Sequence, residues 1–333
     1  MLKTLTLIVS GLNPLRAGDE QGAGHWPRLA RLAGRGSLAR RPIDARQDAL
    51  HAAVLEALQL RDAAEDYPSA AVIRTGLGGE PADGFWLRAQ PIHFAAGLDR
   101  LTMVPLQGQA RMSAAERNSL TPTLVDHLQS TGFELHDGDA GEWLLRSEAP
   151  LQLQTVSPDF AAANPTENIL PRGRDAGGLR RLMTELQMLL HEHPVNAQRQ
   201  LRGLPVLNAI WMHGEGMLSD VSAHVSAPAL PAACGDDVYL RGIYRLHGQP
   251  VKSAATNASE LLSQLDGPSV ALIDVTSAET FETQWLAPLT RALMSGTIAR
   301  LTLMFGGWRV VTHRADLFKL WRSDLQPANW VAC

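Results

Sequence analysis

The chain has 333 residues, of which 45% are hydrophobic and 19% charged, with 28 glycines and 20 prolines. This composition excludes long disordered, collagen-like and coiled-coil proteins, and the length indicates two domains of ordinary size. The formal net charge of −4 excludes a general electrostatic attraction to nucleic acid or anionic lipid. The basic residues comprise 27 arginines and 3 lysines. We interpret this excess as a coding bias, because alanine is abundant too.

The cysteine content and the apolar runs indicate a cellular compartment. Cys234 and Cys333 are too few for a disulfide framework or a cysteine-based zinc site. The N-terminal apolar run is too short for a signal peptide, and no run approaches the ~18 apolar residues of a membrane span. We therefore expect a cytoplasmic protein that binds neither nucleic acid nor membrane.

Before residue 85 the pattern alternates between buried strands and amphipathic helices. Leu2–Val9 is an apolar run without strict alternation, as expected for a strand covered on both faces. Pro27–Leu38 and Asp44–Leu60 carry apolar residues at helical spacing, and the second begins at an N-capping aspartate. Ala70–Thr75 is predicted as a short strand, and the glycines of Gly76–Gly84 indicate a domain boundary.

The middle of the chain mixes strands with two helices. Ser113, with Glu116 three residues later, forms a capping-box pattern that begins a helix toward Gln129. Gly178–His193 is a long amphipathic helix that Pro194 ends. The predicted strands are Phe85–Arg88, Asp99–Leu106, Gly132–His136, Glu142–Arg146 and Leu151–Val156.

Strand–helix alternation returns after residue 236. The predicted strands are Asp237–Leu246, Ser269–Val275, Ala299–Phe305 and Trp308–Thr312, with helices at Glu279–Met294 and Asp316–Trp321. Such alternation at both ends of the chain predicts one discontinuous α/β core domain, formed by residues 1–84 and 217–333. Residues 85–216 would form an inserted α+β domain.

The first candidate metal ligands are His191 and His193. Their spacing of two residues places the side chains on nearly opposite faces of a helix, and the H-E-x-x-H pattern of zinc proteases is absent. A helix C-terminus, where a histidine interacts with the helix dipole before Pro194, is the simpler interpretation.

Arginines form a second candidate site, for an anion, because guanidinium groups suit phosphate and carboxylate. Arg199 and Arg202 follow a turn, and Arg88 ends a strand of the same predicted domain. The alternative is that these three are solvated or ion-paired arginines with no ligand.

The common nucleophile and phosphate-binding motifs are absent. The sequence contains no G-x-S-x-G, no Walker loop and no G-x-G-x-x-G after the first strand. Asp236, Asp237 and Asp274 lie at strand edges and are suitable metal ligands in principle, but capping and turn formation are the simpler roles for them.

One stretch carries a long and specific set of spaced residues, which we call the His193–Gly216 string. The string comprises His193, Pro194, Val195, Asn196, Arg199, Gly203, Asn208, Trp211, Gly214 and Gly216. It resembles the archaeal-type cofactor-independent phosphoglycerate mutases of the alkaline phosphatase superfamily, and more closely their proteobacterial relatives, the RpfE-type regulatory proteins. Weaker similarity lies in the family's order at Pro27–Gly36, Trp86–Ala89 and Val270–Val275.

The resemblance implies an α/β fold with an alkaline-phosphatase-like core and an inserted α+β domain. In the mutases, two divalent metals and a serine nucleophile lie at the strand ends of the core, and arginines of the inserted domain hold the phosphoglycerate. The metals, Mn or Zn, lower the pKa of the nucleophile and stabilise the phosphoryl charge.

The sequence departs from this pattern at the expected metal ligands. Ser10 stands where the family has aspartate, and Ser277–Phe281 replaces Asp-Glu-x-x-His. The family's last strand leads into Asp-His, whereas Phe305 is followed here by Gly306-Gly307. The family's loop that carries the nucleophilic serine has no equivalent near Pro42–Asp48. Ser157–Asp159 occupies the place of the family's Asp-Pro-His. The loss of several ligands predicts poor metal binding.

These observations lead to three hypotheses. The first is a non-catalytic, regulatory cytoplasmic protein without a metal cofactor, a pseudoenzyme that binds a protein partner or a small phosphorylated anion. The second is a metal-dependent mutase or phosphatase with a rearranged site and two Mn or Zn ions per chain. The third is that the His193–Gly216 string is retained for structural reasons alone, because its glycines suit turns.

For the first hypothesis we predict that Arg88, Arg199 and Arg202 converge in a polar concave site between the inserted domain and the core, near His193, Asn196 and Asn208. The alternative is that Asn196 and Asn208 cap local turns and that Arg199 pairs with Glu185 or Glu192. The candidate ligand-binding residues are Arg88, His193, Asn196, Arg199, Arg202, Asn208 and Trp211.

Overall fold

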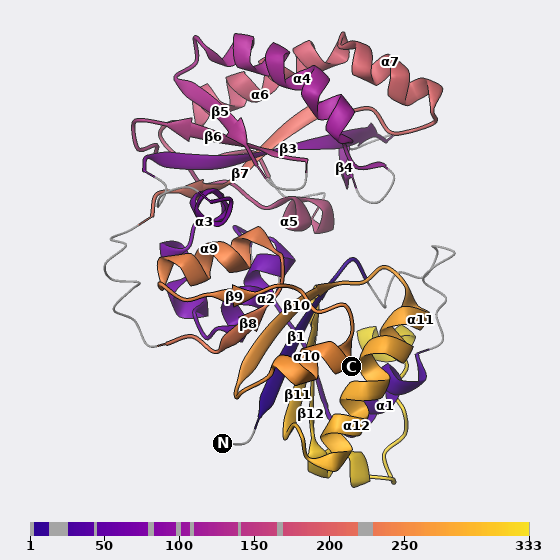
Figure 1. Cartoon of the computed structure of the whole chain (residues 1–333). Coiled ribbons are helices and arrows are strands. Elements are labelled where there is room, and N and C mark those ends of the chain that lie inside the picture. Colours follow the sequence, from indigo (N-terminus) through magenta and orange to yellow (C-terminus); the bar gives the residue numbers. More distant parts are fainter. Residues whose placement is uncertain are drawn as a thin grey trace. The chain divides into compact units, whose positions relative to one another are not determined.

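The computed structural model describes residues 3–12, 26–42, 45–78, 83–97, 101–106, 110–138, 141–164, 169–218 and 229–332. The chain divides into two compact units (Figure 1). Unit 1 comprises residues 1–42, 49–62 and 227–333, and unit 2 comprises residues 43–48 and 63–226. The 3-10 helix η1 (Arg61–Asp66) carries the chain from one unit to the next. Among the described residues, no helix is both long and apolar enough to span a bilayer.

Unit 1 contains a seven-stranded mixed sheet in the order β2-β12-β11-β1-β10-β8-β9. β1 lies between β10 and β11 and pairs with both in parallel, whereas β12 runs antiparallel to β11 after a tight turn at Gly306. The strands are β1 (Thr4–Ser10), β2 (Ser37–Arg40), β8 (Ala232–Cys234), β9 (Val251–Lys252), β10 (Ser269–Asp274), β11 (Arg300–Phe305) and β12 (Trp308–His313).

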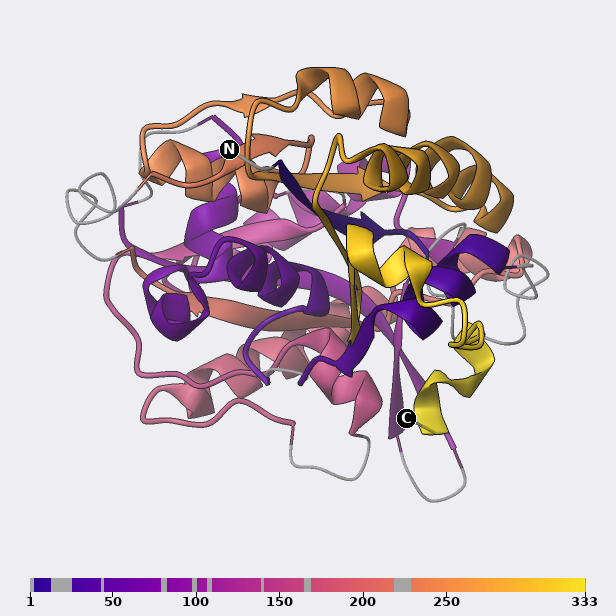
Figure 2. The same cartoon turned by 90° about the horizontal axis from the view of Figure 1, so that it is seen from below.

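Helices cover both faces of this sheet (Figure 2). Leu5 and Leu7 of β1 pack in one buried cluster with α1, α10 and α12. On α2, His51 stacks on Tyr239 of α9 with ring centroids 4.0 Å apart. The elements are α1 (Pro27–Arg35), α2 (Ala49–Ala57), α9 (Val238–Leu246), α10 (Ala258–Gln264), α11 (Ala278–Thr280), the π-helix η3 (Phe281–Leu286), α12 (Ala287–Ser295) and the 3-10 helices η4 (Arg314–Phe318) and η5 (Pro327–Ala332).

Unit 2 is built on a five-stranded antiparallel sheet. The order is β4-β3-β6-β5, and β7 pairs with the long strand β3 as well. The strands are β3 (Phe85–Ala96), β4 (Leu101–Pro105), β5 (Phe133–Asp137), β6 (Trp143–Ser147) and β7 (Ala209–Gly216), and the helices are α3 (Ser69–Gly76), α4 (Ala114–Leu128), α5 (Pro158–Ala163), α6 (Ala176–His191) and α7 (Pro194–Leu201).

The capping-box prediction at Ser113 is confirmed. The Glu116 backbone N–H donates to Ser113 Oγ, and the Ser113 backbone N–H donates in turn to the Glu116 carboxylate at 2.7 Å. The hairpin predicted across Gly306-Gly307 and the buried strands at both ends of the chain are confirmed as well. These segments carry either a specific cap or a buried apolar run that a strand satisfies.

Two predicted strands are wrong. Ala70–Thr75 lies in helix α3, and Asp237–Leu246 is helix α9, whose N-cap Asp237 accepts a hydrogen bond from the Leu240 N–H at 2.8 Å. Both helices are buried on most sides. The apolar run of α3 has almost no polar face, so its pattern does not distinguish a helix from a buried strand. In α9 the helical signal is present, because Arg241 and Arg245 lie four residues apart on one face, and the strand prediction missed it.

Other boundaries differ in smaller ways. The first predicted helix ends at Arg35, and β2 follows it directly. Pro194 ends the long helix as expected but also begins α7, and the helix predicted for Glu279–Met294 contains the π-helix η3. Leu151–Val156 forms only an isolated bridge at Gln154. The predicted N-cap Asp44 lies outside the described residues.

The division into units places α3 in unit 2, whereas the predicted inserted domain begins at residue 85. The physical reason is packing, because α3 lies against β3 and β7.

Candidate functional site

The carboxyl ends of the parallel strands of unit 1 are the first place to look for a site, because open α/β sheets bind ligands at this edge. Ser10 is the last residue of β1 and pairs with Asp274, the last residue of β10. Phe305 ends β11 next to them, and Gly306 follows. This edge therefore presents one hydroxyl and one carboxylate from its three central strands.

The hydroxyl and the carboxylate contact each other. Ser10 Oγ donates to Asp274 Oδ1 at 3.0 Å in an exposed position. Gly11 follows with a φ of +73°, and a Cβ there would lie 2.2 Å from the same Oδ1 atom. The close approach of Asp274 to the chain therefore requires glycine at this position.

The two aspartates that follow the neighbouring strand β8 are already bound within unit 1. Asp236 forms an ion pair with Arg241, and Asp237 caps α9. Among the described residues, no three or more His, Cys, Asp or Glu side chains come close enough together to hold a metal ion. A pair of catalytic divalent ions needs several such ligands, so the described donor set does not fit the metal pair of the mutases.

The His193–Gly216 string lies in unit 2, and its first residues form the start of α7. His193 caps the helix by accepting a hydrogen bond at Nδ1 from the Val195 N–H, and Pro194 occupies the first turn. Partial burial lowers the pKa of His193, against the opposite effect of a backbone hydrogen bond at Ser119. His193 therefore serves the backbone as a neutral acceptor at the start of α7, whereas the sequence interpretation placed it at the end of the preceding helix.

Arg199 is fully buried, and its guanidinium binds groups of the same unit. Nη1 donates to both carboxylate oxygens of Glu116 at 3.0 Å, and Nε donates to the Pro205 carbonyl at 2.7 Å. Nη2 donates to the Ala110 carbonyl. Arg199 thus joins α7 to the start of α4 and to the loop before β7.

Glu116 is the residue on which this arrangement depends. Burial alone would raise the pKa of Glu116, but hydrogen bonds from Ser113 and the charge of Arg199 outweigh burial and hold the pKa below its usual range. Arg202 lies 3.6 Å from the same carboxylate but is 60% exposed. The alternative pairing of Arg199, with Glu185 or Glu192, is wrong in its partner, which is Glu116.

The two asparagines of the string bind backbone groups that are further away in the sequence than the groups a local cap would bind. Asn196 donates to the carbonyls of Leu190 and Leu207 and accepts from the Leu207 N–H, all within 2.8 Å. Asn208 bonds both backbone groups of Phe94 on β3, at 2.7 and 2.9 Å. Both side chains therefore connect elements of unit 2.

The rest of the string also packs inside unit 2. Trp211 is buried and donates from Nε1 to the Val156 carbonyl at 2.8 Å. Gly214 has a φ of +67°, and a Cβ there would lie 2.1 Å from Ser69 Oγ on α3. The glycine allows α3 to approach β7 closely.

Arg88 has carboxylate partners separate from those of Arg199. Its guanidinium contacts both oxygens of Glu142 and forms an ion pair with Asp48. Burial alone would lower the pKa of Arg88, but these two carboxylates raise it, so the group stays charged. The structure thus brings Arg199 and Arg202 to one carboxylate and places Arg88 at two others. The ligand role of all seven predicted residues stays a prediction.

No known family model matches the chain. Over 138 residues it is 31% identical to the 2,3-bisphosphoglycerate-independent phosphoglycerate mutase of Methanothrix thermoacetophila. The chain is related to the cofactor-independent phosphoglycerate mutases. The match covers 41% of the chain and only 30% of the relative.

Two solved structures resemble the chain over nearly its whole length. A protein from Pyrococcus horikoshii has a TM-score of 0.46 at 18% identity, with 98% of this chain and 92% of that chain covered. The cofactor-independent phosphoglycerate mutase of Thermoplasma acidophilum has a TM-score of 0.42 at 17% identity, with 98% and 95% covered.

Proposed function

We propose that the chain is a non-catalytic, regulatory relative of the cofactor-independent phosphoglycerate mutases, of the RpfE type, acting in the cytoplasm. The observation that carries the proposal is the donor set at the carboxyl edge of the unit 1 sheet. The three central strands end at Ser10, Asp274 and Phe305, of which only Asp274 has a carboxylate. This carboxylate accepts a hydrogen bond from the Ser10 hydroxyl.

The chemistry of phosphoryl transfer explains why this donor set matters. In a two-metal site the ions stabilise both the attacking and the leaving oxygen, and they lower the pKa of the nucleophile. One carboxylate beside a serine supplies a hydrogen bond but neither of these effects. A rearranged enzyme would need further ligands from outside the described residues.

The relation to the mutases does not argue against this proposal. The similar residues at His193–Gly216 bind backbone and carboxylate groups inside unit 2, so that part of the sequence is constrained by folding. A chain that has lost catalysis keeps such residues, because their loss destabilises the fold. The partner of the regulatory role is a protein or a small phosphorylated anion.

The test is a coupled phosphoglycerate mutase assay on the full chain with Mn²⁺, run beside the Asp274→Asn variant. We expect no turnover above the rate without protein, and no difference between the two chains. Turnover that a chelator abolishes and added metal restores, and that Asp274→Asn removes, would overturn the proposal in favour of a rearranged enzyme.

A further inference from the structure

The turn that follows η4 in unit 1 exposes three large apolar side chains within four residues. Phe318 is 62% exposed, Leu320 75% and Trp321 79%. Of the other seven tryptophans of the chain, all of them described, six are buried and Trp308 is half-buried. Single exposed apolar residues are ordinary, whereas a group of them indicates an interaction surface. We call Phe318, Leu320 and Trp321 the apolar turn.

Hydrogen bonds within unit 1 hold the apolar turn in place. The Arg322 backbone N–H donates to the Lys319 carbonyl at 3.1 Å and closes the turn. Arg322 Nη1 donates to the Gly36 carbonyl, just after α1, at 3.1 Å. Arg35 Nη1 of α1 donates back to the Leu317 carbonyl at 2.7 Å. The apolar side chains are therefore exposed on a fixed backbone.

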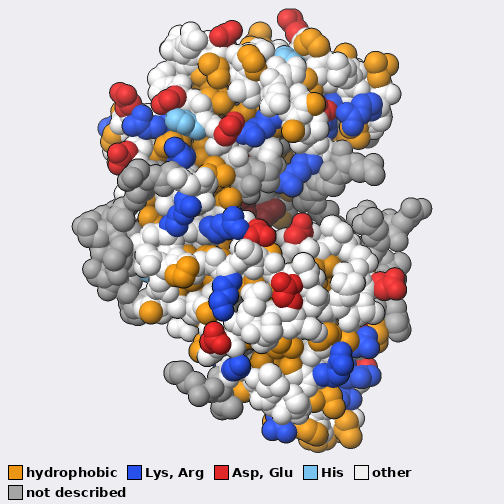
Figure 3. Space-filling model, viewed as in Figure 1, with side chains coloured by type: hydrophobic (Ala, Val, Ile, Leu, Met, Phe, Trp, Pro, Cys, Tyr) orange, Lys and Arg blue, Asp and Glu red, His pale blue; other side chains and the backbone are white. Residues whose placement is uncertain are grey.

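The chain around the apolar turn is strongly basic. Arg314 Nε donates to the Met294 carbonyl at 3.1 Å, so η4 lies against the end of α12 as well as α1. Residues 27–35, 287–300 and 314–324 together contain eight basic side chains and two acidic ones, whereas the net charge of the whole chain is −4. Figure 3 shows basic and apolar side chains next to one another at the end of unit 1 where Figure 1 labels α1 and α12. The charge of the whole chain hides this local excess.

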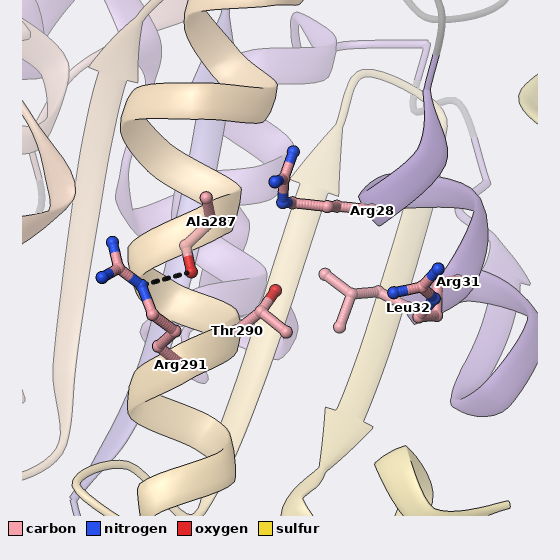
Figure 4. Close-up of a pocket in the computed structure, with 6 residues that line it drawn as sticks. All are labelled: Arg28, Arg31, Leu32, Ala287, Thr290 and Arg291. Carbon is pink, nitrogen blue, oxygen red and sulfur yellow. Dashed lines mark hydrogen bonds between the residues drawn. The ribbon is translucent and has the colours of Figure 1, made fainter. Parts of the chain in front are cut away.

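These positive charges spread over the end of the unit and do not converge on one point. Figure 4 shows the Arg291 guanidinium on one side of α12, and Arg28 and Arg31 of α1 on the other side. Of the two acidic residues, Asp324 lies 3.9 Å from Arg31, and Asp316 is only 13% exposed. Such a distribution suits an extended anionic surface better than a single small anion.

The exposure and the charge of this surface decide what covers it. A second copy of the chain would bring two positive surfaces together, which costs electrostatic free energy. A protein partner would need a preformed apolar pocket for side chains that stand out as far as these do. A bilayer interface is fluid and accepts protruding Trp, Phe and Leu side chains, and anionic lipids attract Lys and Arg.

We propose that this end of unit 1 binds the surface of an anionic phospholipid bilayer. Phe318, Leu320 and Trp321 insert among the head groups, and the surrounding arginines and Lys319 face the lipid phosphates. So few apolar side chains give reversible binding, to which the basic residues add. The cytoplasmic leaflet is the anionic one, so such binding is compatible with a cytoplasmic protein. The proposal does not depend on the loss of catalysis.

The experiment is sedimentation of the full chain with vesicles of phosphatidylcholine alone and of phosphatidylcholine mixed equally with phosphatidylglycerol. We expect at least about tenfold tighter binding to the anionic vesicles. Raising sodium chloride from about 0.1 M to about 1 M shortens the Debye length from about 10 Å to about 3 Å and should weaken this binding about tenfold or more. Equal binding to the two kinds of vesicle, or no effect of salt, would refute the proposal.

Tryptophan fluorescence reports on insertion, because Trp321 is the most exposed tryptophan of the chain. Anionic vesicles should shift the emission to shorter wavelength and reduce quenching by acrylamide. Both changes should be absent in Trp321→Ser. Changes of the same size in this variant would show that another part of the chain contacts the lipid.

Leu320→Ser has a matched control in Leu201→Ser, because Leu201 at the end of α7 in unit 2 is 89% exposed. Leu320→Ser should weaken binding to anionic vesicles about threefold or more and Trp321→Ser about tenfold or more, since each removes apolar surface that the bilayer buries. Leu201→Ser should bind as wild type does. The substituted side chains are exposed, so the thermal unfolding of all three variants should match that of wild type.

Two further results would count against the proposal. Wild-type affinity for anionic vesicles in Trp321→Ser would remove the apolar turn from the binding surface. A dimer that Trp321→Ser dissociates, in a chain that binds no vesicles, would assign the turn to a second copy. Mutase activity has no bearing on either result.

Discussion

The His193–Gly216 string in unit 2 and the carboxyl edge of the unit 1 sheet differ in what their polar side chains contact. Polar side chains of the string bind buried groups of their own unit: Arg199 binds Glu116, and Asn208 binds Phe94. The carboxyl edge is where mutase chemistry is expected, yet it presents Ser10 beside Asp274 in an exposed contact.

This difference indicates how much the side chains of each region contribute to the stability of their unit. In the string, a substitution would leave a buried charge or backbone group without its partner, and that cost is largest in the interior. At the exposed edge a substitution leaves the partner group accessible to water, so its cost should be small. The comparison therefore predicts large stability effects in the string and small ones at the edge.

The largest effect is expected from Arg199→Met, which keeps most of the side-chain volume and removes the charge. Glu116 would remain buried without its partner, and the free energy of unfolding should fall by about 3–5 kcal/mol. The control is Arg202→Met, whose 60% exposed side chain should contribute about 1 kcal/mol or less. Urea unfolding of both variants measures the difference, and similar small losses would contradict the comparison.

Asn196→Ala should have the next largest effect. It removes two hydrogen bonds to backbone carbonyls and one from the buried Leu207 N–H, so unfolding should become easier by about 1–3 kcal/mol. Gln200→Ala on the exposed side of the same helix serves as the control and should change little. A loss in Asn196→Ala no greater than in Gln200→Ala would show that these hydrogen bonds do not stabilise unit 2.

The pH dependence of stability tests the ion pair between Glu116 and Arg199 through the titration of the Glu116 carboxylate. The pKa of folded Glu116 lies below the ~4.3 of an unfolded glutamate, so its stabilising effect is full above that pH and is lost as the pH falls through the folded value. Wild type should therefore exceed Glu116→Gln in stability near neutral pH, and the gap should close in acid. A gap that is constant from pH 7 to pH 3 would rule out the depressed pKa.

The smallest effect is expected at the carboxyl edge. Asp274→Asn keeps an acceptor oxygen for the Ser10 hydroxyl in an exposed position, so stability should change by about 1 kcal/mol or less. Thermal unfolding of Asp274→Asn and Arg199→Met, measured side by side, compares the smallest expected loss of stability with the largest. A loss in Asp274→Asn as large as that of Arg199→Met would remove the distinction between the two regions.

The sequence predicts those parts of the fold that carry a local signal. The capping box at Ser113 and the buried runs that form β1, β10 and β11 are visible as patterns. Helix α3 is not, because a short helix buried on nearly all sides has no polar face. Its apolar run has the composition of a buried strand, and only its packing against β3 and β7 decides between the two.

The candidate site shows the same limit at the level of single residues. The sequence locates Arg199 and Asn208 but does not identify their partners, because Glu116 and Phe94 lie 83 and 114 residues away. Glu116 was visible only as half of a capping box, and its second role depends on the approach of α7 to α4.

Elemental analysis of the full chain, purified without chelator and then dialysed against Mn²⁺ or Zn²⁺, tests the central claim most directly. The described carboxyl edge offers Asp274 as its carboxylate beside Ser10, so we expect well below one tightly held metal ion per chain, unchanged in Asp274→Asn. About two Mn or Zn ions per chain, as a two-metal phosphoryl-transfer site holds, would contradict the account if Asp274→Asn released them.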